Sequence, residues 1–297
     1  MSLRRNRALA AIAAGAAVAL AALIWPGGGG SASPGLVTQS LSGALTAQDL
    51  ANDLAGAGVT VSNVTYAGAD VAAGRFNGGT GIIGFESGII LSSGDIANVT
   101  GPNIQDSITG DNGLPGDSDL DSLVPGYTTF DAAVLQFDFV PSSDVVSFVY
   151  VFGSDEYNEY VGVNDVFGFF VNGVNYALIP PVTGIPVSIN NVNCGSPFVG
   201  AGPNCESYRN NDPDDPGPPT IDTELDGLTI VLGFQAPVNP GVTNHIKLAI
   251  ADAADSILDS DVFVKAGSFV PEPLPTHTAT PTSTGTETAT PTTAGTK

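Results

Sequence analysis

Short apolar or alternating runs, separated by Gly, Pro, Asn and Asp, make up most of the chain after residue 58. Runs of this length that are rich in Val, Ile and Phe predict β-strands joined by turns. They lie at residues 59–66, 88–92, 132–140, 145–152, 166–171, 174–179, 186–192, 228–235, 245–251 and 262–270. Because no helical periods alternate with them, we expect an all-β domain, a β-sandwich or jelly-roll-like fold, rather than a parallel α/β fold.

One stretch carries the signals of a helix. Thr46 can cap residues 47–55, Asp49 stands three positions further on, and glycines follow at 56 and 58. This arrangement predicts one short N-terminal helix. We therefore expect a folded domain over residues 45–270, preceded by a linker at 34–44.

The two ends of the chain differ from this domain. Residues 1–33 combine a basic start, an apolar run at 8–25 and small residues, which is typical of a secretory signal peptide. The run is nearly long enough to remain in a membrane as an N-terminal anchor, and both interpretations export the rest of the chain. Residues 271–297 are mostly Thr, Pro, Ala, Ser and Gly, so we expect a disordered stalk there.

The chain carries 30 acidic and 8 basic residues, a formal net charge of −22. Such a surface repels nucleic acid and anionic lipid, so neither is an expected partner apart from possible membrane attachment through residues 8–25. The two cysteines, Cys194 and Cys205, predict one local disulfide in an exported protein.

The densest polar cluster covers residues 153–160 and is followed by an Asn-Asp pair at 164–165. It lies between two apolar runs and is therefore expected at one end of a sheet. Like charges this close raise each other's proton affinity unless a cation or hydrogen bonds offset them. A second acidic group spans residues 252–261, and in a sandwich the two could share one end. Carboxylate and amide oxygens suit Ca²⁺. The hypothesised calcium ligands are Asp155, Glu156, Glu159, Asn164, Asp165, Asp252, Asp255 and Asp261.

Two alternatives to calcium remain open for the 153–160 cluster. It can be a solvated loop, or Asp155, Glu156 and Glu159 can supply the carboxylate pair of a secreted hydrolase acting on polysaccharide. Against catalysis, the only tryptophan, Trp25, lies in the leader, and no G-x-S-x-G motif occurs. We expect a non-catalytic protein.

A third acidic run, residues 111–121, resembles a calcium loop in its alternating Asp. The sixth and twelfth positions counted from Asp117 hold Ser122 and Thr128 instead of the Gly and Glu of an EF-hand. Residues 111–121 are therefore either a solvated turn or a calcium loop of a different kind.

Several separated segments carry a family resemblance. They read SGIILSSG at 87–94, DAAVLQFDF at 131–139, VFGSDEYNEYVG at 151–162, NDVFGFFVNG at 164–173 and HIKLAIADA at 245–253. In this order they resemble the choice-of-anchor L domain of exported bacterial surface proteins. The resemblance implies an extracellular or cell-surface location and brings no catalytic residues. Residues 270–273 are similar to the opening of a PEP-type sorting tail but lack its apolar helix and basic end, which leaves the mode of attachment open.

These observations together favour adhesion. The expected partners are a surface glycan, a matrix component or a protein ligand, contacted through calcium-stiffened loops. A structural sheath or surface-assembly component is the remaining alternative.

Overall fold

The computed structural model describes residues 35–179 and 184–274, which belong to one compact unit, Ser33–Lys297. The predicted leader or anchor at 1–33 and nearly all of the predicted stalk lie outside the described residues. Within the described ranges, no helix has the length and apolar character needed to cross a membrane.

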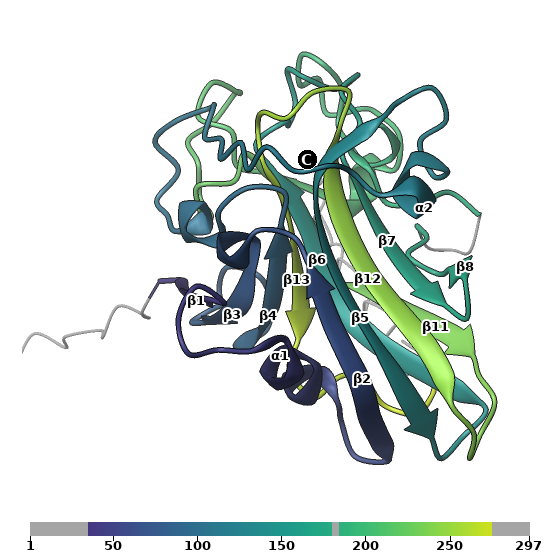
Figure 1. The fold of residues 1–297 in the computed structure, drawn as a ribbon. Helices are drawn as coiled ribbons and strands as arrows, with labels where there is room; N and C mark the ends of the chain where they lie inside the picture. The colour runs from purple at the N-terminus through teal and green to yellow at the C-terminus, as the bar shows by residue number, and fades with distance from the viewer. Residues whose placement is uncertain (1–34, 180–183, 275–297) are drawn as a thin grey trace, which may run out of the picture. The chain divides into compact units, whose positions relative to one another are not determined.

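The described residues form two antiparallel sheets (Figure 1). The eight-stranded sheet has the order β1 (Val37–Ser40), β3 (Ala73–Asn77), β4 (Ser87–Ser92), β13 (Ser260–Lys265), β6 (Val145–Ser154), β10 (Gly227–Thr229) and β9 (Tyr208–Asn210), with β11 (Leu232–Pro237) also paired to β6. The five-stranded sheet has the order β2 (Val59–Ala67), β5 (Thr129–Pro141), β12 (Asn244–Ala253), β7 (Val166–Val171) and β8 (Val174–Asn175). The all-β prediction is confirmed.

The main core lies between the two sheets. Phe148 of β6 packs against Phe169 of β7, and Phe169 packs against Phe234 of β11, with ring centroids 4.0 Å apart in both pairs. Smaller apolar clusters cover the outer face of each sheet, around Phe263 on one and Leu120 on the other. Because both faces are covered, the central strands read as nearly continuous apolar runs instead of strict alternation.

The predicted helix forms as α1 (Ala47–Leu54). The Thr46 hydroxyl accepts a hydrogen bond from the Asp49 backbone N–H at 3.2 Å, and the Asp49 carboxylate accepts one from the Thr46 N–H at 3.0 Å. This reciprocal capping box satisfies backbone donors that the first helical turn leaves free. Leu50 and Leu54 are buried against the main core.

The short helical elements were not predicted. The second α-helix, α2 (Ser118–Asp121), is one turn long, and the 3₁₀ turns are η1 (Asp70–Ala72), η2 (Ile96–Val99), η3 (Ile189–Asn191) and η4 (Cys205–Ser207). Asp117 caps α2 and also accepts two 2.6 Å bonds from the Lys247 ammonium. In the 111–121 run, Asp117 thus has a protein cation as its partner.

Some strand boundaries differ from the sequence pattern. The segment expected to be a linker, 34–44, contains β1, and β3 and β9 were not predicted. The run at 186–192 forms a 3₁₀ turn, and the run at 228–235 divides into β10 and β11. These are short elements whose pairing depends on neighbouring strands more than on their own side chains.

Replacing Phe169 by alanine is expected to cost about 3–5 kcal/mol of unfolding free energy, because the fully buried ring packs against two other rings between the sheets. Urea unfolding of the full chain measures this cost. Val174→Ala, at a side chain that is 54% exposed, is the matched control and should change stability by less than about 0.5 kcal/mol. Equal effects of the two substitutions would contradict the assignment of the core.

Candidate functional site

The two predicted acidic groups meet at one end of the sandwich. Strands β4, β6 and β12 end there, and β7 and β13 begin there, at the upper end in Figure 1. We call this region the acidic end and define it by its five buried carboxyl groups, listed here: Asp155, Asp165, Asp252, Asp259 and Asp261. The sequence placed these residues in two separate loops, and the fold brings the loops together.

Asp165 links the two sheets at the acidic end. One carboxylate oxygen accepts a 2.9 Å bond from the Ala253 N–H of β12, and the other accepts a 2.7 Å bond from the Ser260 hydroxyl of β13. The Asp252 carboxyl group lies within hydrogen-bonding reach of Asp165. Neither carboxyl oxygen of Asp252 makes a hydrogen bond of good geometry among the described residues, although Asp252 is only 1% exposed. The Ser93 hydroxyl is a further polar neighbour.

A β-bulge lies directly beside Asp252. The register of β5 against β12 shifts between Ile250 and Asp252, and Asp131 on β5 has a left-handed φ of 50°. Bulges commonly re-aim side chains next to functional sites. The Asp131 carboxylate is itself satisfied, because it accepts bonds from the backbone N–H groups of Asn112 and Leu114.

A second set of carboxyl groups surrounds Asp155. Its neighbours include Asp226, Asp259 and Asp261, and one carboxyl oxygen each of Asp155, Asp226 and Asp261 has no partner. Asp226 does accept a 2.8 Å bond from the Asn103 amide. Asp226 was not predicted as a site residue, because an Asp-Gly pair before a strand has the signature of an ordinary turn.

Burial dominates the electrostatics of the acidic end. It raises the pKa of Asp155, Asp252 and Asp261 well above the ordinary range, and neighbouring carboxylates add to the effect. Burial also raises the pKa of Asp165 to about 7, even though hydrogen bonds with Ser260, Ala253 and Asp252 oppose the shift. In the described ranges, no hydrogen bond or ion pair joins a Lys or Arg side chain to these groups.

The remaining predicted ligands have different surroundings. Glu156 and Asp255 line a cavity of about 350 Å³, and each lies close enough to Asp165 for their charges to interact. The Asn164 amide oxygen accepts a 3.0 Å bond from the Asn190 N–H, so this side chain holds one loop to another. Glu159 faces a different pocket.

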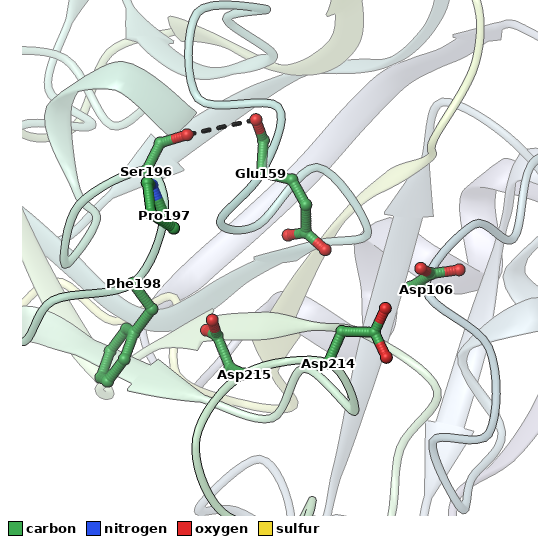
Figure 2. A pocket seen from close by; sticks show the side chains of 7 residues that line it. All are labelled: Asp106, Glu159, Ser196, Pro197, Phe198, Asp214 and Asp215. Carbon is green, nitrogen blue, oxygen red and sulfur yellow. Dashed lines mark hydrogen bonds between the residues drawn. The ribbon is translucent and has the colours of Figure 1, made fainter.

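The Glu159 pocket has a volume of about 370 Å³ (Figure 2). Figure 2 shows the carboxylates of Asp106, Asp214 and Asp215 around it together with Glu159, and the Phe198 ring at its margin. Partial burial and a hydrogen bond with the Asp212 carboxyl group raise the pKa of Glu159 to about 7.

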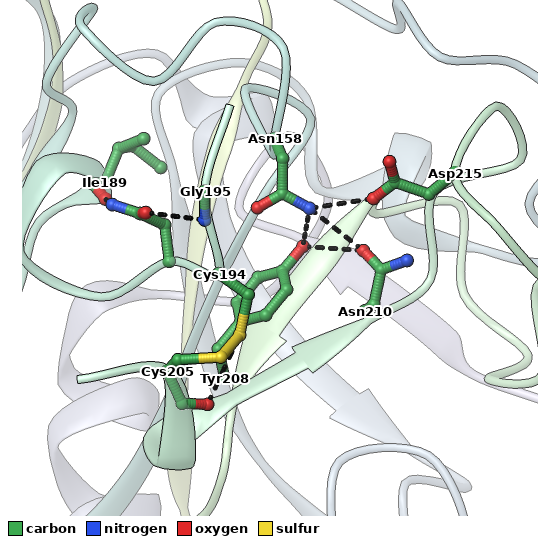
Figure 3. Close-up of a disulfide and its surroundings, with 9 residues drawn as sticks. Asn158, Ile189, Cys194, Gly195, Cys205, Tyr208, Asn210 and Asp215 are labelled. Atoms are coloured by element: carbon green, nitrogen blue, oxygen red, sulfur yellow. Dashed lines mark hydrogen bonds between the residues drawn. A yellow bond between two sulfur atoms is a disulfide. The ribbon is translucent and has the colours of Figure 1, made fainter. Parts of the chain in front are cut away.

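Cys194 and Cys205 form the predicted disulfide (Figure 3). It closes the loop that supplies Ser196, Pro197 and Phe198 to the Glu159 pocket. Beside it, the Asn158 amide lies 3.0 Å from the Tyr208 hydroxyl and 2.9 Å from the Asp215 carboxylate. These contacts fasten the loop that carries Glu159 to β9 and to the segment that follows it. The Ser196 hydroxyl, inside the disulfide loop, donates to the Glu159 carbonyl at 3.2 Å.

Chemically, the acidic end offers only hard oxygen donors. Across residues 35–179 and 184–274, no group of three or more His, Cys, Asp or Glu side chains has the spacing that a bound metal ion needs. Any cation there must therefore also draw on hydroxyl, carbonyl or water oxygens.

Stability without divalent cations is expected to fall as the pH rises from 5 to 8. In the unfolded chain the carboxyl groups titrate near pH 4, whereas burial raises the pKa of Asp165 to about 7 and that of Glu156 to about 10. The folded protein therefore binds more protons than the unfolded chain in this window, and the free energy of unfolding declines with pH.

Scanning calorimetry in EDTA at both pH values measures this slope. Asp252→Asn, which removes one of the buried titrating groups, should flatten it. A melting temperature that rises towards pH 8 in EDTA would contradict the assignment of buried, protonated carboxyl groups.

The family of the chain follows from comparison of its sequence and structure with known proteins. The search of curated proteins and the search of solved structures each found no significant match. The family description "Choice-of-anchor L domain" matches residues 38–270, which is most of the chain and includes both sheets. The disulfide fits an extracellular location. The chain therefore belongs to the choice-of-anchor L domain family, which implies an exported bacterial surface protein.

Proposed function

We propose that this domain is a non-catalytic binding module of the bacterial surface whose acidic end takes up Ca²⁺. In this proposal the cation stiffens the surrounding loops, and those loops contact the adhesion ligand: a surface glycan, a matrix component or another protein. The alternative of a secreted hydrolase has no observation in its favour beyond the presence of carboxyl groups.

The observation that carries the proposal is the set of buried carboxyl oxygens without a donor. Within residues 35–179 and 184–274, both oxygens of Asp252 and one each of Asp155 and Asp261 are buried and make no hydrogen bond of good geometry. Burying an ionised carboxylate without a compensating partner costs several kcal/mol, so such groups are protonated, paired or bound to a cation. A divalent cation offsets several of these charges at once.

The donor set fits calcium better than a transition metal. The groups that surround Asp252 supply oxygen ligands, among them the Asp165 carboxylate and the hydroxyl of Ser93. Ca²⁺ accepts six to eight oxygen ligands in flexible geometry and commonly completes its shell with backbone carbonyls and water. In this proposal the shell combines carboxylates with such ligands.

The position of the site explains how a cation would influence ligand binding. Asp155 opens the loop that follows β6, and Asp252 lies at the end of β12, just before the 254–259 loop. A cation that binds both Asp155 and Asp252 would order the two loops before the ligand arrives. The loops then lose less conformational entropy when the ligand binds.

Thermal unfolding of the full chain, in excess EDTA and in millimolar calcium, tests the cation site. At one hundred times the dissociation constant, calcium should add about 2.7 kcal/mol and raise the melting temperature by several degrees. Asp252→Asn should abolish this gain with little loss of stability in EDTA, because asparagine is isosteric with the protonated acid. The exposed Asp144→Asn should keep the gain. A melting temperature that calcium leaves unchanged would disprove the site.

Adhesion is tested with beads that carry the full chain on arrays of polysaccharides and matrix proteins. We expect retention in calcium that EDTA and Asp252→Asn each reduce at least several-fold, while Asp144→Asn has no effect. Breakdown of an arrayed polysaccharide that Glu156→Gln abolishes would instead establish the hydrolase.

A further inference from the structure

The cavity that contains Glu156 differs in character from the rest of the acidic end. It lies between the loop that follows β6 and the loop that follows β12, and has a volume of about 350 Å³. Its apolar lining comes from Tyr160, Val163, Ile257 and Leu258. Tyr160 is 46% exposed and Ile257 is 50% exposed, so apolar surface stands open to solvent on the two loops.

The walls of this cavity are fixed by backbone hydrogen bonds. The Tyr160 N–H donates to the Glu156 carbonyl at 3.2 Å, and the Val163 N–H donates to the Tyr160 carbonyl at 2.9 Å. On the opposite wall, the Leu258 N–H donates to the Thr109 hydroxyl at 3.1 Å. The cavity is therefore formed by ordered loops and does not depend on the binding of a ligand.

Glu156 supplies a buried carboxyl group to one wall of the cavity. Its side chain is 1% exposed and one of its carboxyl oxygens, Oε2, has no hydrogen-bond donor among the described residues. Asp255 is the second acid of the cavity and lies close by. A buried carboxyl oxygen without a donor, beside a second carboxyl group, fits a ligand that brings a hydrogen-bond donor and a positive charge, since a cation favours the ionised form of both acids.

Among the described residues, no hydrogen bond or ion pair brings a Lys or Arg side chain to Glu156 or Asp255. Arg75 is paired with Asp53, Lys247 with Asp117 and Asp119, and Arg209 with backbone carbonyl groups elsewhere. Each of these three cations is thus engaged away from the cavity.

Apolar walls with carboxyl groups beside them match one kind of ligand group: an aliphatic chain that ends in a cation. Lysine and arginine side chains bury their methylene stems along apolar surface and present a charged head. The Tyr160 ring can also attract that charge through its π-face. A bare metal ion would leave the apolar lining without a partner, and the acidic surface disfavours an anionic ligand.

We infer that this cavity binds the side chain of a lysine or arginine from a protein ligand of the surface domain. The inference rests on the proposed function as a binding module and narrows its partner from three classes to a protein with exposed basic residues. In the bound state, the cationic head donates to Glu156 and Asp255, and the stem lies against Ile257 and Leu258.

The test uses the full chain in saturating calcium, titrated by calorimetry with Nα-acetyl-lysine methylamide. Nα-acetyl-norleucine methylamide, which has a similar stem and no charge, is the control ligand. We expect the lysine derivative to bind with a dissociation constant on the order of 1 mM and the norleucine derivative at least tenfold more weakly. Equal affinity for the two ligands, or absence of binding to the lysine derivative, would overturn the inference.

Variants separate this site from the cation site. Glu156→Gln should weaken lysine binding about tenfold or more, and Tyr160→Leu, at an exposed position, several-fold. I257K, which tethers a cation at the cavity, should block the probe while the protein stays folded, because Ile257 is half exposed. Asp144→Asn is the charge-matched control and should bind normally. Unchanged binding by I257K would also overturn the inference.

The calcium site and the basic-ligand cavity can be disproved independently of each other. A calcium-dependent rise in melting temperature without lysine binding would disprove only the basic-ligand cavity. Lysine binding that persists in EDTA and in Asp252→Asn, with no calcium effect on unfolding, would disprove only the cation site.

Discussion

Neutralising the charge of buried carboxyl groups is the condition on which the upper end of the sandwich depends. Asp165 accepts one hydrogen bond from β12 and one from the first residue of β13, so a single carboxylate connects the two sheets. Asp252 stands against it without a donor. The fold brings acids from distant parts of the chain into a low-dielectric space, and the repulsion between them must be relieved by protons or by a cation. The stability of this end is therefore linked to the composition of the medium, in contrast to the aromatic core below it.

The acidic residues of this region differ in their hydrogen-bond partners. Asp131 and Asp165 are satisfied by backbone or hydroxyl donors and organise the strand ends. Asp155, Asp252 and Asp261 keep free oxygens inside the protein. Glu156 and Glu159, three positions apart on one loop, line two separate cavities. The cluster is thus a set of adjoining sites with one shared electrostatic constraint.

The disulfide and the aromatic rings beside it support the outer part of this region. The ring centroids of Tyr157 and Tyr208 lie 4.8 Å apart, and the Asn158 amide joins the Tyr208 hydroxyl to Asp215. These contacts therefore hold Tyr208 and Asp215 next to the loop of residues 155–165. An exported surface protein benefits from such covalent support, because a disulfide persists outside the cytoplasm. The net charge of −22 also favours cationic partners for the exposed cavities.

The sequence alone determined the class of fold, the α1 capping box, the disulfide and most of the central strands, because each depends on local patterns or on the presence of just two cysteines. It also predicted that the acids of residues 153–160 lie at one end of a sheet, since two strongly apolar strands flank them. The tertiary structure decided which of these acids meet. Asp226 joined the group from a turn that looked ordinary, Asn164 became a loop contact, and β1 formed inside an expected linker, because each outcome depends on pairing between residues far apart in the chain. Burial, which gives the carboxyl groups their unusual proton affinity, is likewise a property of the packed sheets, so no single segment of the sequence could reveal it.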